Sequence, residues 1–473
     1  MKTTLFLATG TLLAALLPAG PSSAASHVDY VGAGPFRTGP DVTKKCLECH
    51  EKEAKAFMAS AHWTWARKQT VNGRQVELGK KNALNNFCIA VPSNWPRCTS
   101  CHAGYGWKDA SFDFTKAENI DCLVCHDTTG TYRKFPTGSG HPVYEGEKKE
   151  FPKGQPWEPA DLLKVAQGVG KPNRQTCGAC HFYAGGGDHV KHGDLDASLK
   201  SPSREIDVHM GGTAGMVCQA CHRGDEAHTI KGSARSVSPA AGPEVMGCTD
   251  CHKGEAHKNV VLGRHTARVA CQTCHIPTFA KDRPTKVWWD WSTAGKDVKP
   301  EDVPRDKYGE KLYDKMKGDF VWGKDVVPTY LWYDGSVDRL LMGDKVDPAK
   351  VVKLSSSRGD RKDPKSRIFP FKLMRGRQAY DSENRTIAVA NVFGPEGYWT
   401  KYDWNLAIAA GMKAAGQPYS GKFGWAETSM VWPVNHMVSP KEKALKCTDC
   451  HGEKGRLDWK ALGYQGDPRT KSD

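Results

Sequence analysis

Apolar residues form one long run at the start of the chain and only short patterns after it. The run Leu5–Leu17 follows Lys2 and precedes the small residues Ser23-Ala24-Ala25, which is typical of a cleaved export signal covering residues 1–25. The run is too short to cross a bilayer, and no later apolar segment approaches its length. We therefore expect an exported mature protein that does not span a membrane.

Beyond this leader, periodic patterns are short and are separated by loops. A helical spacing of apolar residues runs through Phe57–Trp63, and Leu406–Ala415 has the pattern of a second helix. The 48 glycines and 28 prolines are frequent between the patterned segments, as loops require. These patterns predict a mainly α protein with short helices, long loops and few strands.

The cysteines follow one repeated motif. Cys-x-x-Cys-His occurs eight times and uses 16 of the 17 cysteines. In this motif the two cysteines attach a porphyrin through thioether bonds, and the histidine binds its iron. Zinc sites do not explain why histidine follows the second cysteine every time. We therefore expect eight covalently attached haems c, and export to the periplasm agrees with this because c-type haem is attached outside the bacterial cytoplasm.

The motifs define the residues expected to hold these haems. The attaching cysteines are Cys46, Cys49, Cys98, Cys101, Cys122, Cys125, Cys177, Cys180, Cys218, Cys221, Cys248, Cys251, Cys271, Cys274, Cys447 and Cys450. The motif histidines, expected as iron ligands, are His50, His102, His126, His181, His222, His252, His275 and His451.

The motifs are unevenly distributed along the mature chain. Seven lie within residues 26–275, which we expect to form a haem-dense domain that contains the active site. Residues 276–446 carry no motif and are rich in aromatic residues, so we expect them to wrap the haems, either walling the active site or only covering haem edges. Residues 447–473 hold the eighth motif and a tail. The expected architecture is a multihaem cytochrome c fold whose short helices and long loops pack around an array of eight haems.

The formal net charge of +14 would by itself favour a nucleic-acid partner. Eight haems change this sum, because their propionates add roughly −8 in the oxidised protein and roughly −16 in the reduced protein. The excess of Lys and Arg is therefore expected to neutralise propionates and to attract small anions. We expect no nucleic-acid partner.

A haem that only transfers electrons needs a second strong ligand on its iron, most often histidine. Ten histidines lie outside the motifs. His27 lies beside the expected cleavage site and is expected to be spare, while His141 and His189 are left unassigned. The expected distal ligands are His62, His192, His209, His228, His257, His265 and His436.

Two features point beyond simple electron transfer. Cys88 is the one cysteine outside the motifs and lies ten residues before the second motif. Gly185-Gly186-Gly187 allows a close backbone approach, and the following Asp188 and Lys191 share one face if they form a helical turn. From the residues alone, Lys191 is either an iron ligand, which needs a neutral amine, or a partner of a haem propionate. Cys88 is either reactive or a buried inert thiol.

Several stretches together resemble the octahaem tetrathionate reductase family over nearly all of the mature chain. They are Asn85-Asn86-Phe87-Cys88, Cys98–Trp107, Gly185–Asp188, Lys191–Asp196, Cys271–Pro277 and Asn435-His436-Met437.

This resemblance implies that the second haem is catalytic and that a lysine, here Lys191, is its distal ligand. It also implies pocket roles for Asn85, Cys88 and Asp188. A further pocket lysine of the family corresponds to either Lys281 or Lys286, and we leave that choice open.

We accordingly expect a multihaem reductase that converts tetrathionate to thiosulfate and also reduces nitrite and hydroxylamine to ammonium. Its partners would be a small anionic or nitrogenous substrate and a periplasmic or membrane electron donor, such as a quinol-linked cytochrome. Cys88 would exchange sulfur with tetrathionate, and Asp188 or a lysine would deliver protons.

Two alternatives stay open. One is a non-catalytic electron conduit in which every haem has two histidine ligands, with His141 or His189 supplying the eighth. The other is hydroxylamine oxidation at the same iron. The enzymes that carry out that oxidation use a tyrosine crosslinked to the catalytic haem, and the sequence identifies none.

Overall fold

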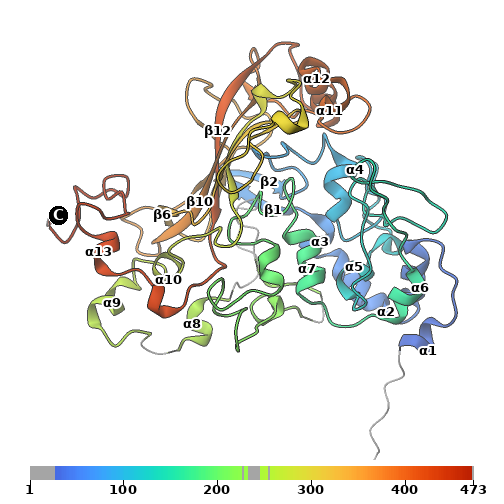
Figure 1. Cartoon of the computed structure of the whole chain (residues 1–473), viewed down its shortest axis with the longest axis horizontal. Helices are drawn as coiled ribbons and strands as arrows, with labels where there is room; N and C mark the ends of the chain where they lie inside the picture. Colours follow the sequence, from blue (N-terminus) through green and yellow to red (C-terminus); the bar gives the residue numbers. More distant parts are fainter. Residues whose placement is uncertain (1–26, 226–227, 233–245, 254–255, 471–473) are drawn as a thin grey trace, which may run out of the picture.

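The computed structural model describes residues 27–225, 228–232, 246–253 and 256–470 (Figure 1). The expected export signal, residues 1–25, lies outside this part of the chain. Short helices and loops form a broad layer along the lower side of the molecule in Figure 1, and a sheet rises from the middle of that layer. Among the described residues, no helix combines the length and the apolar composition needed to cross a bilayer.

Most of the helices are a turn or two long, and many of them carry a haem motif. They are α1 (His27–Val31), α2 (Gly39–Met58), α3 (Ala61–Thr64), α4 (Trp95–Cys98), α5 (Leu123–His126), α6 (Leu162–Gln167), α7 (Arg174–His181), α8 (Cys248–Cys251), α9 (Val260–His265), α10 (Cys271–His275), α11 (Tyr398–Lys401), α12 (Trp404–Ala414) and α13 (Cys447–Cys450).

The ends of the longer helices follow local sequence signals. α2 begins with a capping box, in which the Thr38 side chain accepts the N–H of Asp41 and the Asp41 side chain accepts the N–H of Thr38. The helical pattern at Phe57–Trp63 spans the end of α2 and the start of α3, with a break between them. The second predicted helix corresponds to α12, whose N-cap Asp403 accepts the N–H of Leu406.

The prediction of a mainly α protein is wrong, because 25% of the chain is helical and 19% is in strands. Strands concentrate in the aromatic-rich part of the chain. They are β1 (Arg67–Val71), β2 (Arg74–Leu78), β3 (Thr285–Asp290), β4 (Tyr313–Asp314), β5 (Gly318–Gly323), β6 (Thr329–Tyr333), β7 (Val337–Arg339), β8 (Val352–Lys353), β9 (Ser355–Ser357), β10 (Arg367–Asp381), β11 (Thr386–Ile387) and β12 (Phe423–Pro433).

The main sheet has eight strands and is built around β10. Its order is β4-β5-β3-β10-β12-β8, and β6 and β11 also pair with β10. β10 and β12 run antiparallel from the pair Phe371↔Pro433 to the pair Asp381↔Phe423. Residues 368–372 of β10 are all buried. Because both faces of this part of the strand are covered, the alternation of apolar and polar residues that reveals a half-buried strand is missing from the sequence.

The largest hydrophobic cluster joins this sheet to the segment that precedes the second haem motif. Leu84, Phe87 and Ile89 from that segment pack with Trp289 of β3 and Trp432 of β12. Burying an aromatic or aliphatic side chain of this size contributes about 1.5–3 kcal/mol. The sheet therefore fixes the position of the chain around Cys88, although the two segments are far apart in sequence.

Candidate haem sites and catalytic site

Seven of the eight motif histidines each face one histidine ring from elsewhere in the chain. The ring centroids are 6.1 to 6.4 Å apart in every case. A metal–imidazole bond is about 2 Å long, so two imidazoles on opposite sides of one iron have centroids roughly 6 Å apart. The pairs are His50 with His27, His126 with His228, His181 with His62, His222 with His436, His252 with His209, His275 with His257, and His451 with His265.

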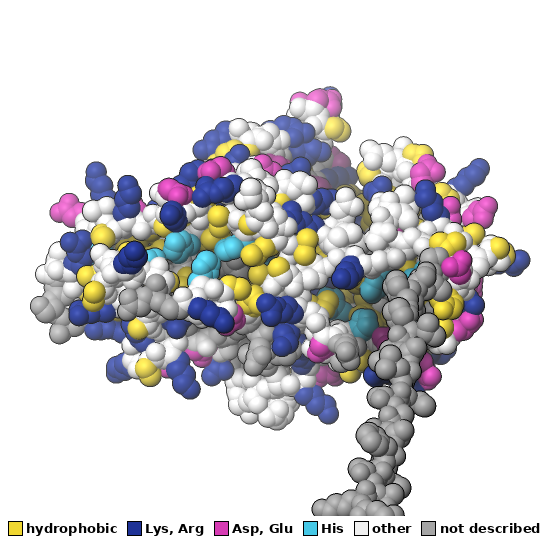
Figure 2. Space-filling view, turned by 90° about the horizontal axis from the view of Figure 1, so that it is seen from below, with side chains coloured by type: hydrophobic (Ala, Val, Ile, Leu, Met, Phe, Trp, Pro, Cys, Tyr) yellow, Lys and Arg dark blue, Asp and Glu magenta, His cyan; other side chains and the backbone are white. Residues whose placement is uncertain are grey.

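These residues suit haem in their surroundings as well as in their spacing. Figure 2 shows histidine side chains gathered in two places on the helical side of the molecule, where the surface is hollowed. Hydrophobic side chains surround them, and Lys and Arg side chains lie around the rim (Figure 2). An apolar bed with basic residues at its edge matches a macrocycle that carries two propionates.

The observed pairs include six of the seven histidines expected as distal ligands. His192 is the exception, because its ring packs against Trp432 with centroids 5.0 Å apart and faces no motif histidine in the described residues. His27, which was expected to be spare, faces His50 instead, at 6.3 Å. It lies on α1, which packs against α6, so this helix takes part in one of the histidine pairs.

The motif cysteines show which sites are neighbours. Cysteine side chains of different motifs lie beside each other, which places the first motif next to the third, the second next to the fourth, the fourth next to the fifth and the sixth next to the seventh. Closely spaced cysteines also link the third motif to the fourth, the fifth to the sixth and the seventh to the eighth. The second motif is therefore a branch attached to the fourth. The adjacent cysteines are Cys46 with Cys122, Cys101 with Cys180, Cys177 with Cys218 and Cys248 with Cys271, and the further neighbours are Cys125 with Cys177, Cys221 with Cys251 and Cys274 with Cys450.

His102 of the second motif has a different environment from the other motif histidines. Its ring is fully buried, its Nε2 lies 2.7 Å from the carbonyl oxygen of Trp63, and no histidine ring of the described residues faces it. The role of His102 as an iron ligand stays a prediction, and its ring is enclosed by aromatic side chains with centroids 4.9 to 6.1 Å away. The enclosing residues are Trp63, Trp65, Trp107, Phe112 and Phe114.

Lys191 lies near the same motif and is buried. The cost of burying its charge, together with the nearby Lys80, lowers the pKa of the Lys191 amine to about 7, while Cys101 opposes this shift. The amine lies 4.9 Å from the ring of Trp432. Within the part of the chain that the structure describes, it makes no hydrogen bond or ion pair. The arrangement presents an amine without a polar partner beside the second motif.

The backbone around Lys191 depends on glycine and on a second buried lysine. Gly185 has φ of +84°, and a Cβ there would lie 2.7 Å from the Cβ of Lys191. Lys372 of β10 is 1% exposed and donates to the carbonyls of Val190 at 2.8 Å and Lys191 at 3.1 Å, and to Thr285 Oγ1 at 2.5 Å. The Thr285 hydroxyl in turn donates to the carbonyl of His189 at 2.6 Å.

Sequence reasoning did not identify Lys372 as part of the site. It lies about 180 residues from the loop that it holds, in the aromatic-rich segment that was expected either to wall the active site or only to cover haem edges. One signal was present, because a lysine inside a run of buried strand residues needs acceptors for its N–H groups.

Cys88 lies against the glycine run that leads to Lys191. A Cβ on Gly186 would come within 3.7 Å of the Cys88 sulfur. Asn85 holds this turn, because its Oδ1 accepts the N–H groups of Phe87 at 3.2 Å and Cys88 at 2.8 Å. Burial raises the pKa of the Cys88 thiol despite four nearby cationic side chains, so the thiol is protonated at neutral pH.

The two candidate pocket lysines lie in different surroundings. Lys286 is 4% exposed, and its amine lies 3.1 Å from the ring centroid of Phe320 and 4.1 Å from that of Trp289. Burial lowers its pKa well below the usual value, and Cys88 is close enough to oppose this. Lys281 instead donates to the carbonyl of Met437 at 2.6 Å and to two further acceptors, away from Cys88. The structure thus brings Lys286, not Lys281, to the pocket.

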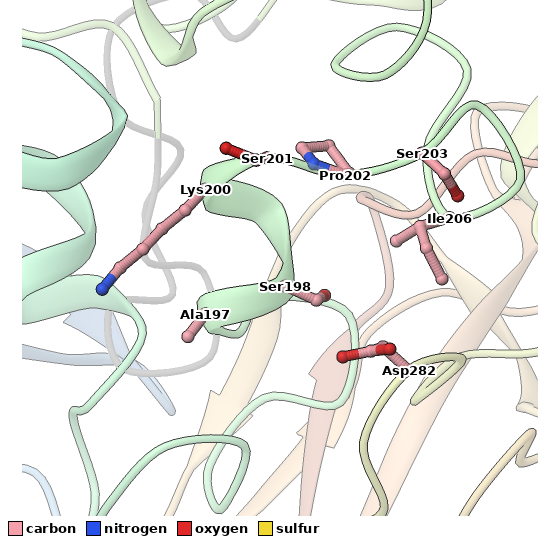
Figure 3. A pocket seen from close by; sticks show the side chains of 8 residues that line it. All are labelled: Ala197, Ser198, Lys200, Ser201, Pro202, Ser203, Ile206 and Asp282. Carbon is pink, nitrogen blue, oxygen red and sulfur yellow. The ribbon is translucent and has the colours of Figure 1, made fainter.

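Asp188 faces away from Lys191 in its polar contacts. Its carboxylate accepts the N–H of Ala197 at 3.0 Å and pairs with Arg283 at 3.2 Å. Ala197 also lines an open pocket of about 400 Å³, in which Ser198, Ile206 and Asp282 point inwards (Figure 3). None of the residues lining that pocket belongs to a haem motif, so we do not assign the catalytic site to it.

Comparison with known proteins agrees with the haem sites. Residues 286–454 match the family described as bacterial cytochrome c, and residues 45–127 match cytochrome c554 and c-prime. A crystal structure of the octahaem cytochrome c from Shewanella oneidensis is 49% identical, with a TM-score of 0.86 over 95% of this chain and 99% of that chain. The chain belongs to the octahaem cytochrome c family. As an octahaem cytochrome c it binds haem c covalently and acts in electron transfer.

A more distant relative covers less of the chain. An uncharacterized protein of Archaeoglobus fulgidus is 26% identical over 219 residues, which make up 39% of this chain and 73% of that protein. The resemblance to multihaem cytochromes that the sequence showed is confirmed by the Shewanella structure.

Proposed function

We propose that this octahaem cytochrome c is a periplasmic reductase whose second haem is catalytic. The observation that carries the proposal is the contrast between the seven histidine pairs and the second motif, where His102 is enclosed by aromatic rings and Lys191 presents an amine without a polar partner. Haem supplies electron transfer between neighbouring sites and, where an axial position is open, a place for substrate to bind iron.

The histidine pairs are proposed to hold seven haems that carry electrons. Each would have two strong ligands and no open position, which suits transfer rather than chemistry. His27 takes the distal place proposed from sequence for His192, because it is the ring that faces a motif histidine. Together with the second motif this makes eight haems, the number in the name of the Shewanella protein.

Lys191 is proposed to bind the second iron in the place that His102 leaves empty. With the Lys191 amine as its protein ligand, that haem would supply a place for a small substrate to bind. Lys372 and Thr285 hold the backbone of Lys191, so the amine is positioned rather than loosely tethered. Lys286 would add positive charge for an anionic substrate when protonated, and a neutral Lys286 could accept a proton.

The proposed reactions are reductions of small anions and nitrogen compounds. Two electrons convert tetrathionate to two thiosulfates, and six and two electrons convert nitrite and hydroxylamine to ammonium. Because burial keeps the Cys88 thiol protonated, a sulfur exchange with tetrathionate would first require its deprotonation. The electron donor is proposed to be a periplasmic or membrane cytochrome linked to quinol.

The alternatives find less support. In a conduit with eight bis-histidine haems, His102 would need a facing histidine, yet among the described residues His141 stacks on Tyr105 and His189 lies against Trp322. Hydroxylamine oxidation would need a tyrosine crosslinked to the second haem. Tyr105, which follows that motif, hydrogen-bonds to Asp121 instead.

The test joins composition, spectroscopy and turnover. Mass spectrometry of the exported protein should show eight haems, one free thiol and loss of about the first 25 residues. An electron spin resonance spectrum of the oxidised protein should show one haem that differs from the others, and a reduced dye should be consumed with tetrathionate, nitrite or hydroxylamine. Eight equivalent low-spin haems without turnover would support the conduit.

A further inference from the structure

The paired histidines differ in what their second ring nitrogen contacts. In three of them, Nδ1 lies 2.7 to 3.1 Å from a main-chain carbonyl oxygen. In two others, Nδ1 meets a carboxylate. These are His436, with Asp194 Oδ2 at 3.3 Å, and His451, with Asp467 Oδ1 at 2.6 Å. The three carbonyl contacts are His126 with Gly170, His222 with Lys231, and His265 with Val261.

Both carboxylates are held in place by main-chain groups. Asp194 has a side chain 5% exposed, and its Oδ2 also accepts the N–H groups of Asn435 at 2.8 Å and His436 at 3.0 Å. Asp467 directs its other oxygen to the N–H of Gly452 at 2.6 Å. Their orientation toward the rings is therefore built into the fold. The contact of His50 with Glu53 is different, because it is 3.8 Å long and both side chains are exposed.

We infer that Asp194 and Asp467 lower the midpoint potentials of the two haems that their histidines hold, relative to haems whose histidines meet only carbonyls. A carboxylate is a stronger acceptor than a carbonyl, so it draws the Nδ1 proton away from the ring and makes the other nitrogen a better donor to iron. Stronger donation favours the ferric state. The inference rests on the histidine pairs proposed above as iron ligands.

The two haem sites whose histidines meet a carboxylate lie at different positions in the order of neighbouring motifs. The fifth motif, with His222 and His436, lies between the fourth and the sixth. The eighth motif, with His451 and His265, neighbours only the seventh among the described contacts and so forms one end. A low potential at that end makes transfer from it toward the interior sites favourable, which suits the eighth motif as the place where a donor docks.

The test is a redox titration of the full-length holoprotein, followed by optical absorption, with Asp194→Asn and Asp467→Asn. Asparagine keeps an oxygen acceptor of the same shape but removes the charge. We expect one component of the titration to move to higher potential in each variant, a different component in the two cases, while the remaining components stay in place.

Asp207→Asn is the matched control. Asp207 is buried, and its carboxylate accepts the N–H groups of Met437 and Val438 in the same segment as His436, but it touches no ring nitrogen. Asp207→Asn therefore removes the same charge as Asp194→Asn, close to the haem proposed for His436. An equal shift in Asp194→Asn and Asp207→Asn, or no shift in either Asp194→Asn or Asp467→Asn, overturns the inference.

If the histidine pairs are not iron ligands at all, the measurements give a different result. In that case the parent protein would lack the electron spin resonance signals of bis-histidine low-spin haem. If the inference alone fails, those signals are present and the potentials do not move. Asp467 lies near the end of the chain, so Asp467→Asn provides the test even if Asp194→Asn disturbs folding.

Discussion

The second haem motif and the other seven have the same sequence pattern but opposite surroundings. At seven motifs the histidine faces a second histidine across a gap of 6.1 to 6.4 Å between ring centroids. At the second motif the histidine ring is enclosed by five aromatic side chains and hydrogen-bonds to a main-chain carbonyl. The motif is therefore compatible with two very different surroundings of its histidine.

This contrast separates attachment from ligation. The two cysteines attach the porphyrin wherever the motif occurs, whereas the ligands of the iron depend on which side chains the fold brings to it. Near the second motif the fold places a buried lysine, Lys191, and the sheet supplies the groups that hold its backbone. The following experiments test this contrast.

Replacing Lys191 should have the largest effect. Lys191→Ala removes the proposed ligand, so the iron of one haem in eight should become high-spin and should bind cyanide or nitrite readily. Changes next to metal ligands already cost about 10- to 100-fold in activity, so we expect turnover to fall at least that far. Stopped-flow binding and dye-linked assays measure the two effects. Unchanged spectra would show that Lys191 is not a ligand and that the two kinds of motif are alike.

Removing the lysine that holds the loop should have the next largest effect. Lys372→Met keeps the length of the side chain but leaves the carbonyls of Val190 and Lys191 without a donor, at a cost of about 1–3 kcal/mol in the free energy of unfolding. A shifted amine should also alter the spectrum of the second haem and lower turnover by about 10-fold or more. Lys281→Met is a matched control, because Lys281 also donates to two carbonyls and one hydroxyl. It should lose stability without altering that spectrum.

Replacing Cys88 should lower the turnover of one substrate more than that of the others. If its sulfur reacts, Cys88→Ala should reduce tetrathionate turnover far more than nitrite or hydroxylamine turnover. Burial raises the pKa of Cys88, so the thiolate is the minor form at neutral pH and its fraction grows as pH rises toward that pKa. The tetrathionate rate should therefore rise by about 10-fold per pH unit if it depends on the thiolate. Equal losses for all three substrates would leave Cys88 a packing residue.

Replacing either of two histidines, His27 or His192, should give the smallest effect. His27→Phe should change one low-spin signal, because His27 faces His50, and should leave most of the turnover intact. His192 follows Lys191 directly in the sequence. His192→Phe should nevertheless leave every low-spin signal in place, since His192 packs on Trp432. Low-temperature spin resonance compares the two variants. Loss of a signal in His192→Phe alone would restore the assignment made from sequence.

Some features of the protein follow from local sequence. The eight motifs identify the attachment residues because the chemistry needs two cysteines and a histidine at a set spacing. The capping box at Thr38 and the cap at Asp403 mark the starts of α2 and α12 because each signal acts within one turn of helix. Six of the seven proposed distal histidines also face motif histidines, since few other residues can serve as strong ligands.

Other features were decided by contacts between distant parts of the chain. The sheet was missed because residues 368–372 of its central strand are buried on both faces, so this part of the sequence lacks the alternation that marks a strand. The structure places His27, not His192, opposite a motif histidine, because α1 packs against α6 while the ring of His192 packs on Trp432. Motif residues alone made His102 look like its seven counterparts. Only the tertiary structure turns its ring into an aromatic enclosure and brings Lys191, held by Lys372 about 180 residues away, to the same site, because axial ligation depends on proximity in space and not on spacing along the chain.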